Sequence, residues 1–205
     1  KAKNLLGLSR NVFYKFYKKA RAEIKKDLGN TASSHSRLFY FQRMIELLDL
    51  KTELLIALDL EQTFWRTFLT NANLFPHTLD LINLLKSKKI PIAIVTDLTA
   101  HIQLRKLTYF GLHDIFDAVV TSEEAGLDKP DSSIFNLTLR KLKINSYDNV
   151  WMVGDNPIAD IWGAKNLGAI TFQKLHKGVI SGKDANLPDF TFTSFKDLYK
   201  LCVNL

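Results

Sequence analysis

The sequence predicts an α/β protein in which a Rossmann-like parallel sheet follows an all-helical first third. After residue 73, short apolar runs rich in β-branched residues alternate with helical segments, a pattern typical of a parallel sheet with right-handed crossovers. Before residue 73, apolar residues recur at helical spacing and no strand pattern is present. We therefore expect a helical subdomain over residues 1–72 and an α/β core over residues 73–205.

The helical third contains three amphipathic segments. The first covers residues 10–28 and stops at Gly29, a residue that favours helix ends. The second and third cover about 36–49 and about 51–70. The small polar stretch 31–36 separates the first two, and we expect it to be a loop. Three helices of this kind predict a small bundle.

The remaining two thirds predict five strands, each followed or preceded by a helix. Apolar, mostly β-branched or aromatic runs place the strands at 90–95, 118–120, 150–153, 169–172 and 190–192. Helical spacing places the helices at about 79–86, 100–110, 131–142, 158–167 and 194–202.

Composition limits the class of protein. The chain is 46% hydrophobic and 11% aromatic, as in packed globular proteins. No apolar run approaches the ~20 residues of a membrane helix, so we expect no membrane partner. The first residue is Lys1, and no signal-peptide segment follows it, so we expect the chain to begin inside a longer gene product. The single cysteine, Cys202, excludes an internal disulfide and predicts a buried thiol in the reducing cytoplasm.

The net charge of +7 comes from the first predicted helix. Residues 1–27 hold nine basic and two acidic residues, and residues 28–205 hold nineteen of each sign. This basic helix is either a solvated face or a surface that attracts an anionic molecule. Nucleic acid is not an expected partner, because no basic groove with interleaved aromatic residues accompanies the charge.

Polar groups follow three of the predicted strands. They are the Thr-Asp pair that ends segment 92–97, the Asp-Lys-Pro segment 128–130, and Gly154-Asp155 with Asp160 five residues after Asp155. In parallel α/β sheets the ligand lies at the carboxyl ends of the strands. A threonine, a lysine and two carboxylates at that edge predict a magnesium-dependent phosphate site.

Residues 73–205 resemble the core of the haloacid dehalogenase-like hydrolases. Val95-Thr96 resembles the second motif of that superfamily, Lys129-Pro130-Asp131 the third, and the segment 154–160 the fourth. The first third resembles the helical cap of the subgroup that contains phosphoglycolate phosphatases, nucleotidases and N-acylneuraminate phosphatases. The resemblance implies a cytoplasmic hydrolase that acts on a small phosphorylated metabolite, with a cap that closes over the site.

The resemblance also implies a role for each motif residue. Thr96 would bind a phosphoryl oxygen, Lys129 would hold an ammonium near that group, and Asp155 would bind Mg²⁺. Asp160 would support the metal site or orient Lys129. Asp97, which stands where the family often has Asn, and Arg37 of the cap complete the expected substrate-binding residues.

The first motif of the family, with its nucleophilic and acid/base aspartates, has no clear counterpart. The nearest match is Asp59 with Glu61, but apolar residues of helical period surround it and the acid/base position is a glutamate. The preferred interpretation places the first strand and both aspartates upstream of the chain. Asp59 as nucleophile is the alternative.

Two other functions stay open. A metal-independent 2-haloacid dehalogenase has the same fold, but the paired carboxylates at 155 and 160 argue against it. A non-catalytic binding protein of this fold would need no nucleophile and could use the basic helix.

Overall fold

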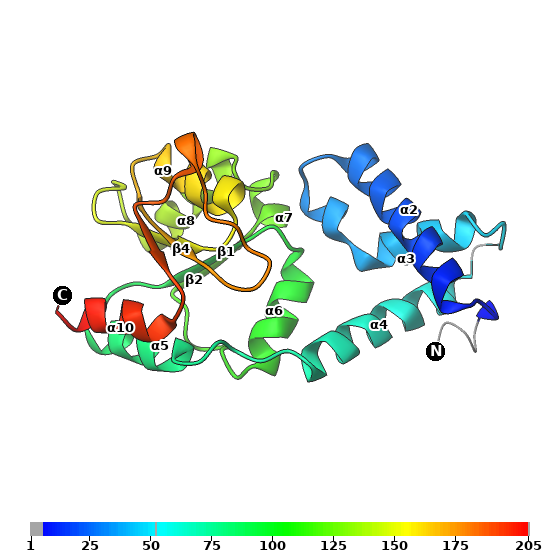
Figure 1. Cartoon of the computed structure of the whole chain (residues 1–205), viewed down its shortest axis with the longest axis horizontal. Helices are drawn as coiled ribbons and strands as arrows, with labels where there is room; N and C mark the ends of the chain where they lie inside the picture. Colours follow the sequence, from blue (N-terminus) through cyan, green and yellow to red (C-terminus); the bar gives the residue numbers. More distant parts are fainter. Residues whose placement is uncertain (1–5, 52, 205) are drawn as a thin grey trace. The chain divides into compact units, whose positions relative to one another are not determined.

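The computed structural model describes residues 6–51 and 53–204. The chain divides into two compact units, Lys1–Asn73 and Leu74–Leu205 (Figure 1). Most elements of each unit correspond to the helices and strands that the apolar pattern predicts. No helix in the described ranges is both long enough and apolar enough to cross a membrane.

The first unit is helical throughout its described residues. In chain order it contains α2 (Arg10–Leu28), the 3₁₀ helix η1 (Ala32–His35), α3 (Arg37–Glu46) and α4 (Leu54–Thr70). Ser9 caps α2 by accepting a hydrogen bond from the Val12 N–H, and Gly29, with φ 60°, ends it. The core of the unit contains Ala20, Phe41, Met44 and Leu60.

Three details of the helical prediction were wrong. The stretch 31–36 contains η1 instead of an open loop. The second helix ends at Glu46 instead of 49, and Asp49, with φ 55°, turns the chain away from the helical direction. The third helix begins at Leu54, and residue 52 of its predicted first turn lies outside the described residues.

The second unit alternates strands and helices. Its elements are α5 (Thr78–Ser87), β1 (Ala93–Thr96), α6 (Ala100–Tyr109), β2 (Ala118–Thr121), α7 (Ser122–Ala125), α8 (Ser132–Leu142), β3 (Trp151–Gly154), the π-helix η2 (Pro157–Trp162), α9 (Gly163–Lys165), β4 (Ile170–Lys174), η3 (Asp184–Asn186), β5 (Phe190–Phe192) and α10 (Phe195–Val203). All five predicted strands are present, so the α/β class is confirmed.

Four features of this unit differ from the prediction by more than a single residue at one end. β1 starts at Ala93, because the preceding Ile92 N–H donates to the Asp117 carboxylate instead of to a neighbouring strand. The predicted helix 158–167 is a π-helix followed by a short α-helix, and β4 continues to Lys174. The one-turn helix α7 was not predicted, because four residues are too few to show a period.

The strands form two parallel sheets instead of one. β1 pairs with β2, and Thr96 lies beside Thr121. The other sheet has the order β3-β4-β5, and Gly154 lies beside Gln173. Within the described residues, β1 and β3 therefore each have a partner strand on one side only.

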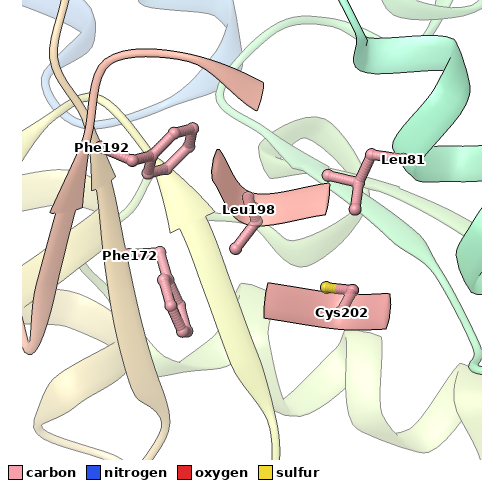
Figure 2. Packing of buried hydrophobic residues seen from close by; sticks show 5 residues of the cluster. All are labelled: Leu81, Phe172, Phe192, Leu198 and Cys202. Atoms are coloured by element: carbon pink, nitrogen blue, oxygen red, sulfur yellow. The ribbon is translucent and has the colours of Figure 1, made fainter. Parts of the chain in front are cut away.

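Two apolar clusters hold this unit together. One joins α5, β4, β5 and α10 through Leu81, Phe172, Phe192, Leu198 and Cys202 (Figure 2). The Cys202 thiol is buried there, as predicted. The other cluster includes Val120 and Ile134, and both Val95 of β1 and Met152 of β3 pack against it. The two sheets thus share one core.

Candidate functional site

The carboxyl end of β1 places two of the predicted residues. Thr96 is the last residue of the strand, and its Oγ1 accepts a hydrogen bond from the Leu98 N–H at 3.4 Å. Asp97 follows directly. Its Oδ1 accepts a hydrogen bond from the Lys129 backbone N–H at 2.9 Å, so the loop after β1 is joined to the segment before α8.

Asp97 is a carboxylate in a partly buried setting. Burial raises the pKa of the Asp97 carboxyl above its ordinary value, while the Lys129 ammonium and backbone N–H act in the opposite direction. The bond to the backbone of Lys129 occupies one carboxylate oxygen. The predicted role of Asp97 in substrate binding stays a prediction.

Lys129 joins the end of β1 to the segment after β3. Its Nζ lies 3.1 Å from the Val95 carbonyl oxygen and 2.7 Å from Asp160 Oδ1. Only 9% of the Lys129 side chain and 7% of the Asp160 side chain are exposed. Because separating such a buried pair would leave an uncompensated charge, the pair keeps the ammonium in one position.

Asp160 also shapes the loop that carries Asp155. Its Oδ2 accepts hydrogen bonds from the backbone N–H groups of Asp155, at 3.1 Å, and Asn156, at 2.9 Å. Gly154 makes this approach feasible, because a Cβ at that position would lie 2.4 Å from the Asp160 side chain. The glycine of the motif is therefore required by the close passage of a carboxylate.

Asp155 is the exposed carboxylate of the group. Its side chain is 53% exposed, and Oδ2 lies 3.1 Å from His176 Nε2. Mg²⁺ is usually held by one or two carboxylates together with water and substrate oxygens, and an accessible carboxylate at the strand ends fits that requirement. No group of three or more His, Cys, Asp or Glu side chains suited to a metal occurs within 6–51 and 53–204.

Arg37 lies in the helical unit, at the start of α3. Its Nη1 donates to the His35 carbonyl at 2.7 Å, and the guanidinium carbon lies 5.3 Å from the ring centroids of both Tyr40 and Phe64 and 5.7 Å from that of Trp65. These contacts hold the guanidinium among aromatic rings. The predicted substrate contact of Arg37 stays a prediction.

Asp59 and Glu61, the alternative first motif, lie in the first half of α4. Within residues 6–51 and 53–204 the element before α4 is α3, so no described strand leads into Asp59. The geometry of a nucleophile at a strand end, which the motifs at 96 and 155 share, is therefore not reproduced at Asp59.

Two residues near Asp155 were not predicted. Gln173, on β4, is fully buried, and its Nε2 donates to the Asp155 carbonyl oxygen at 3.0 Å. His176 follows β4 and contacts the Asp155 carboxylate. Neither belongs to a recognisable motif, and Gln173 does not stand out in β4, which also contains the polar residues Thr171 and Lys174.

Comparison with known proteins agrees with this geometry. The model of the haloacid dehalogenase-like hydrolase family matches residues 5–173, most of the chain. The parallel α/β core and the helical first unit are consistent with this family. The chain therefore belongs to the haloacid dehalogenase-like hydrolases, and the predicted resemblance is confirmed.

Two curated relatives are phosphatases by name. Over 159 residues, 78% of this chain and 66% of the relative, the chain is 42% identical to a ribulose-1,5-bisphosphate 5-phosphatase of Halopiger xanaduensis. Over 131 residues, 64% of this chain and 57% of the relative, it is 34% identical to a glyceraldehyde 3-phosphate phosphatase of Methanocaldococcus jannaschii. The matched regions thus span about two thirds or less of these relatives.

A solved structure supports the fold. The putative hydrolase YfnB of Bacillus subtilis, in a form bound to magnesium, has a TM-score of 0.71 and 21% identity. The match covers 97% of this chain and 84% of that structure. The similarity shows a common fold.

Proposed function

We propose that the protein is a Mg²⁺-dependent phosphatase of a small phosphorylated metabolite. The observation that carries the proposal is that the Lys129 ammonium contacts both the Val95 carbonyl near the end of β1 and Asp160, whose other oxygen binds the backbone that follows β3. Thr96 and Asp155 belong to the same two strand ends. The two curated relatives named as phosphatases support this choice of reaction.

Each residue has a distinct task in the proposed reaction. The Lys129 ammonium would stabilise the negative charge of the phosphoryl group, and Asp160 keeps it from moving. The Thr96 hydroxyl oxygen accepts a hydrogen bond from the Leu98 N–H, and the hydroxyl hydrogen would be donated to a phosphoryl oxygen. Asp155 would hold Mg²⁺, which supplies charge neutralisation at the phosphate when bound.

The nucleophile is proposed to lie in a segment that precedes this chain in the full protein. The division of the sheet supports this proposal. β1 and β3 end at the same site, pack on the same core, and each has one edge without a partner strand within the described residues. A parallel strand between them would join the five described strands into one sheet of six and would bring its own carboxyl end beside Lys129.

On this proposal an aspartate at the end of the added strand attacks phosphorus, the ester oxygen leaves with a proton from a second carboxyl group, and water hydrolyses the aspartyl-phosphate. A cytoplasmic location is part of the proposal. It is supported by the single, buried cysteine.

Two alternatives are less well supported. A metal-independent dehalogenase does not require a metal ligand. It would therefore leave unexplained the exposed Asp155 carboxylate and the Asp160 carboxylate that binds the Asp155 backbone. A non-catalytic binding protein would need neither a buried ammonium at the strand ends nor a glycine that lets Asp160 approach. Metal-independent chloride release from 2-haloacids would favour the first alternative.

The test uses the protein translated from its full coding sequence. We expect it to release phosphate with Mg²⁺ from at least one member of a phosphometabolite panel that includes ribulose 1,5-bisphosphate and glyceraldehyde 3-phosphate. Chelation with EDTA should abolish release. Lys129→Met should lower kcat/KM at least about 100-fold, whereas the surface variant Lys141→Met should not change it. Failure to release phosphate from any substrate would overturn the proposal.

A further inference from the structure

Gln173 joins three segments of the backbone around Asp155. Its Nε2 donates to the carbonyl oxygens of Asp155, at 3.0 Å, and Ile180, at 3.1 Å, and its Oε1 accepts from the Gly182 N–H at 2.9 Å. The side chain is fully buried. Two carbonyl acceptors and one N–H donor allow only one orientation of the carboxamide, so the assignment of its oxygen and nitrogen follows from chemistry.

The segment that Gln173 holds is the turn after β4, residues 175–182, which we call the β4 loop. Gly182 closes this loop tightly, since a Cβ there would lie 1.9 Å from the Asn186 carbonyl oxygen and 3.2 Å from Pro157 Cβ. Pro157 lies two residues after Asp155. The loop therefore packs directly on the segment that carries the proposed metal ligand.

The β4 loop also reaches the Asp155 side chain. His176, two residues into the loop, places Nε2 at 3.1 Å from Asp155 Oδ2. The His176 ring lies 5.5 Å from that of Phe75, centroid to centroid, which restricts its movement. The position of the His176 ring thus depends on the position of the loop.

All three polar parts of Asp155 are engaged by different residues. Asp160 accepts from its N–H, Gln173 donates to its carbonyl oxygen, and His176 contacts its carboxylate. Of these partners, only Gln173 bonds to both the Asp155 backbone and the backbone of the β4 loop, which carries His176. A metal ligand held this way keeps its geometry before the ion arrives, and the loss of such outer contacts weakens metal binding.

We propose that Gln173 is a positioning residue that holds Asp155 and the β4 loop in the arrangement that binds Mg²⁺. The inference rests on the proposed role of Asp155 as the metal ligand. It adds a residue outside the strand-end motifs and assigns the β4 loop to the site. Gln173 acts through Asp155 and does not touch the substrate.

The test is the variant Gln173→Glu in the full-length protein. Glutamate has the shape of glutamine and keeps an acceptor for the Gly182 N–H, but it places an oxygen against the carbonyls of Asp155 and Ile180. We expect Mg²⁺ affinity, measured by isothermal titration calorimetry, to fall about 10- to 100-fold. The Mg²⁺ concentration for half-maximal phosphate release should rise by the same factor, while kcat at saturating Mg²⁺ changes less than about threefold.

Thr171→Val is the matched control. Thr171 is a fully buried polar residue on the same strand, and its hydroxyl donates to Asp189 at 2.7 Å, away from Asp155. We expect this variant to lose stability but to bind Mg²⁺ as the wild type does. If Gln173→Glu binds Mg²⁺ with unchanged affinity, or if Thr171→Val loses the same affinity, the inference is wrong.

A measurement on the wild type keeps the inference testable if Gln173→Glu does not fold. Because Gly182 and Asp155 share the Gln173 carboxamide, Mg²⁺ should slow hydrogen exchange of the Gly182 amide at least about fivefold, as linkage requires. Unchanged exchange at Gly182 in Mg²⁺-saturated protein would contradict the inference. If the wild type binds no Mg²⁺ at all, it is the proposed metal dependence that fails, so the two failures are distinguishable.

Discussion

At Asp160, one buried carboxylate serves two segments of the chain. Oδ1 holds the Lys129 ammonium, and Oδ2 accepts from the backbone N–H groups of Asp155 and Asn156. A carboxylate is suited to this task because each of its oxygens accepts more than one hydrogen bond. The residue was predicted to support the metal site or to orient Lys129, and its contacts are compatible with both roles.

Asp160→Asn should destabilise the protein strongly. The substitution leaves the Lys129 ammonium buried without a counter-charge, and breaking a buried pair in this way costs about 3–5 kcal/mol. Urea denaturation measures the free energy of unfolding. Glu124→Gln is the matched control, because its ion pair with Lys141 is exposed by 44% and 36% at the two side chains and should contribute at most about 1 kcal/mol. Equal losses of unfolding free energy in the two variants would show that burial of an ion pair does not determine its contribution to stability.

Asp97→Asn tests the electrostatic environment at the end of β1. Burial raises the pKa of the Asp97 carboxyl, so the folded protein binds this proton more tightly than the unfolded chain does. The contribution of Asp97 to stability therefore falls as pH rises from the ordinary carboxyl pKa to the raised one. Asn keeps an oxygen for the Lys129 N–H and has no proton to lose. We expect the stability of the variant, relative to wild type, to increase as pH rises above the ordinary carboxyl pKa of about 3.9.

Asp131 provides a control for the sign of the pH effect at Asp97, because the pKa of its carboxyl is shifted in the opposite direction. Hydrogen bonding from Ser133 lowers the pKa of the Asp131 carboxyl, so Asp131 contributes stability at neutral pH that is lost as pH falls through the lowered value. Asp131→Asn should therefore lose stability relative to wild type as pH rises toward the ordinary carboxyl pKa of about 3.9, and change little above it. Denaturation curves in which both variants change with the same sign would show that the assignment for Asp97 is wrong.

At the scale of single elements, the apolar periodicity predicted where a helix lies better than which type of helix it is. The helices α2, α5, α6, α8 and α10 begin and end within two residues of their predicted bounds, because each places an apolar stripe on one face. The π-helix η2 could not be read from spacing. Its geometry follows from Asn156, whose side chain accepts from the N–H groups of Ile158 and Ala159, and from Asp160, which must reach back to the strand end.

The amphipathic face of α5 gives a direct test of core packing. Leu81 belongs to the cluster with Phe172 and Cys202 (Figure 2) and is 6% exposed. Leu79, on the same helix, is 45% exposed. Leu81→Ala removes buried methyl groups and leaves a cavity, so it should lower the free energy of unfolding by about 2–5 kcal/mol. Leu79→Ala should change it by less than about 1 kcal/mol. Thermal and urea unfolding measure the free energy of unfolding of both variants. Similar losses would contradict the assignment of Leu81 to the buried face of α5 and of Leu79 to its exposed face.

At the scale of the whole molecule, the order of strand-end motifs predicted the class and most of the candidate site. Thr96 and Lys129 lie far in the sequence from the segment with Asp155 and Asp160, but the Lys129 ammonium contacts both the Val95 carbonyl of β1 and Asp160. Gln173 and His176 escaped prediction for a physical reason. Gln173 bonds to the Asp155 backbone and His176 contacts its carboxylate. Both contacts depend on the path of the β4 loop, which is set by tertiary contacts at Gly182.

The division of the sheet leads to a prediction about the complete protein. β1 and β3 pack on one core and end at one site, but they do not pair with each other, and β1 is only partly buried along its whole length. Central strands of α/β sheets are normally covered and paired on both sides. A strand from the preceding segment of the full protein would supply the missing partner for both edges.

The full-length protein should therefore protect β1 and β3 more than the 205-residue chain does. We expect hydrogen exchange to slow at least about tenfold at amides within Ala93–Thr96 and Trp151–Gly154, because an inserted strand gives them new partners. Amides of Phe190–Phe192, which pair with β4 in both proteins, provide the internal control, and their exchange should change less. If exchange in β1 and β3 is the same in both proteins, no strand enters between them, and the nucleophile would have to come from elsewhere in the chain, with Asp59 on α4 as the first candidate to substitute.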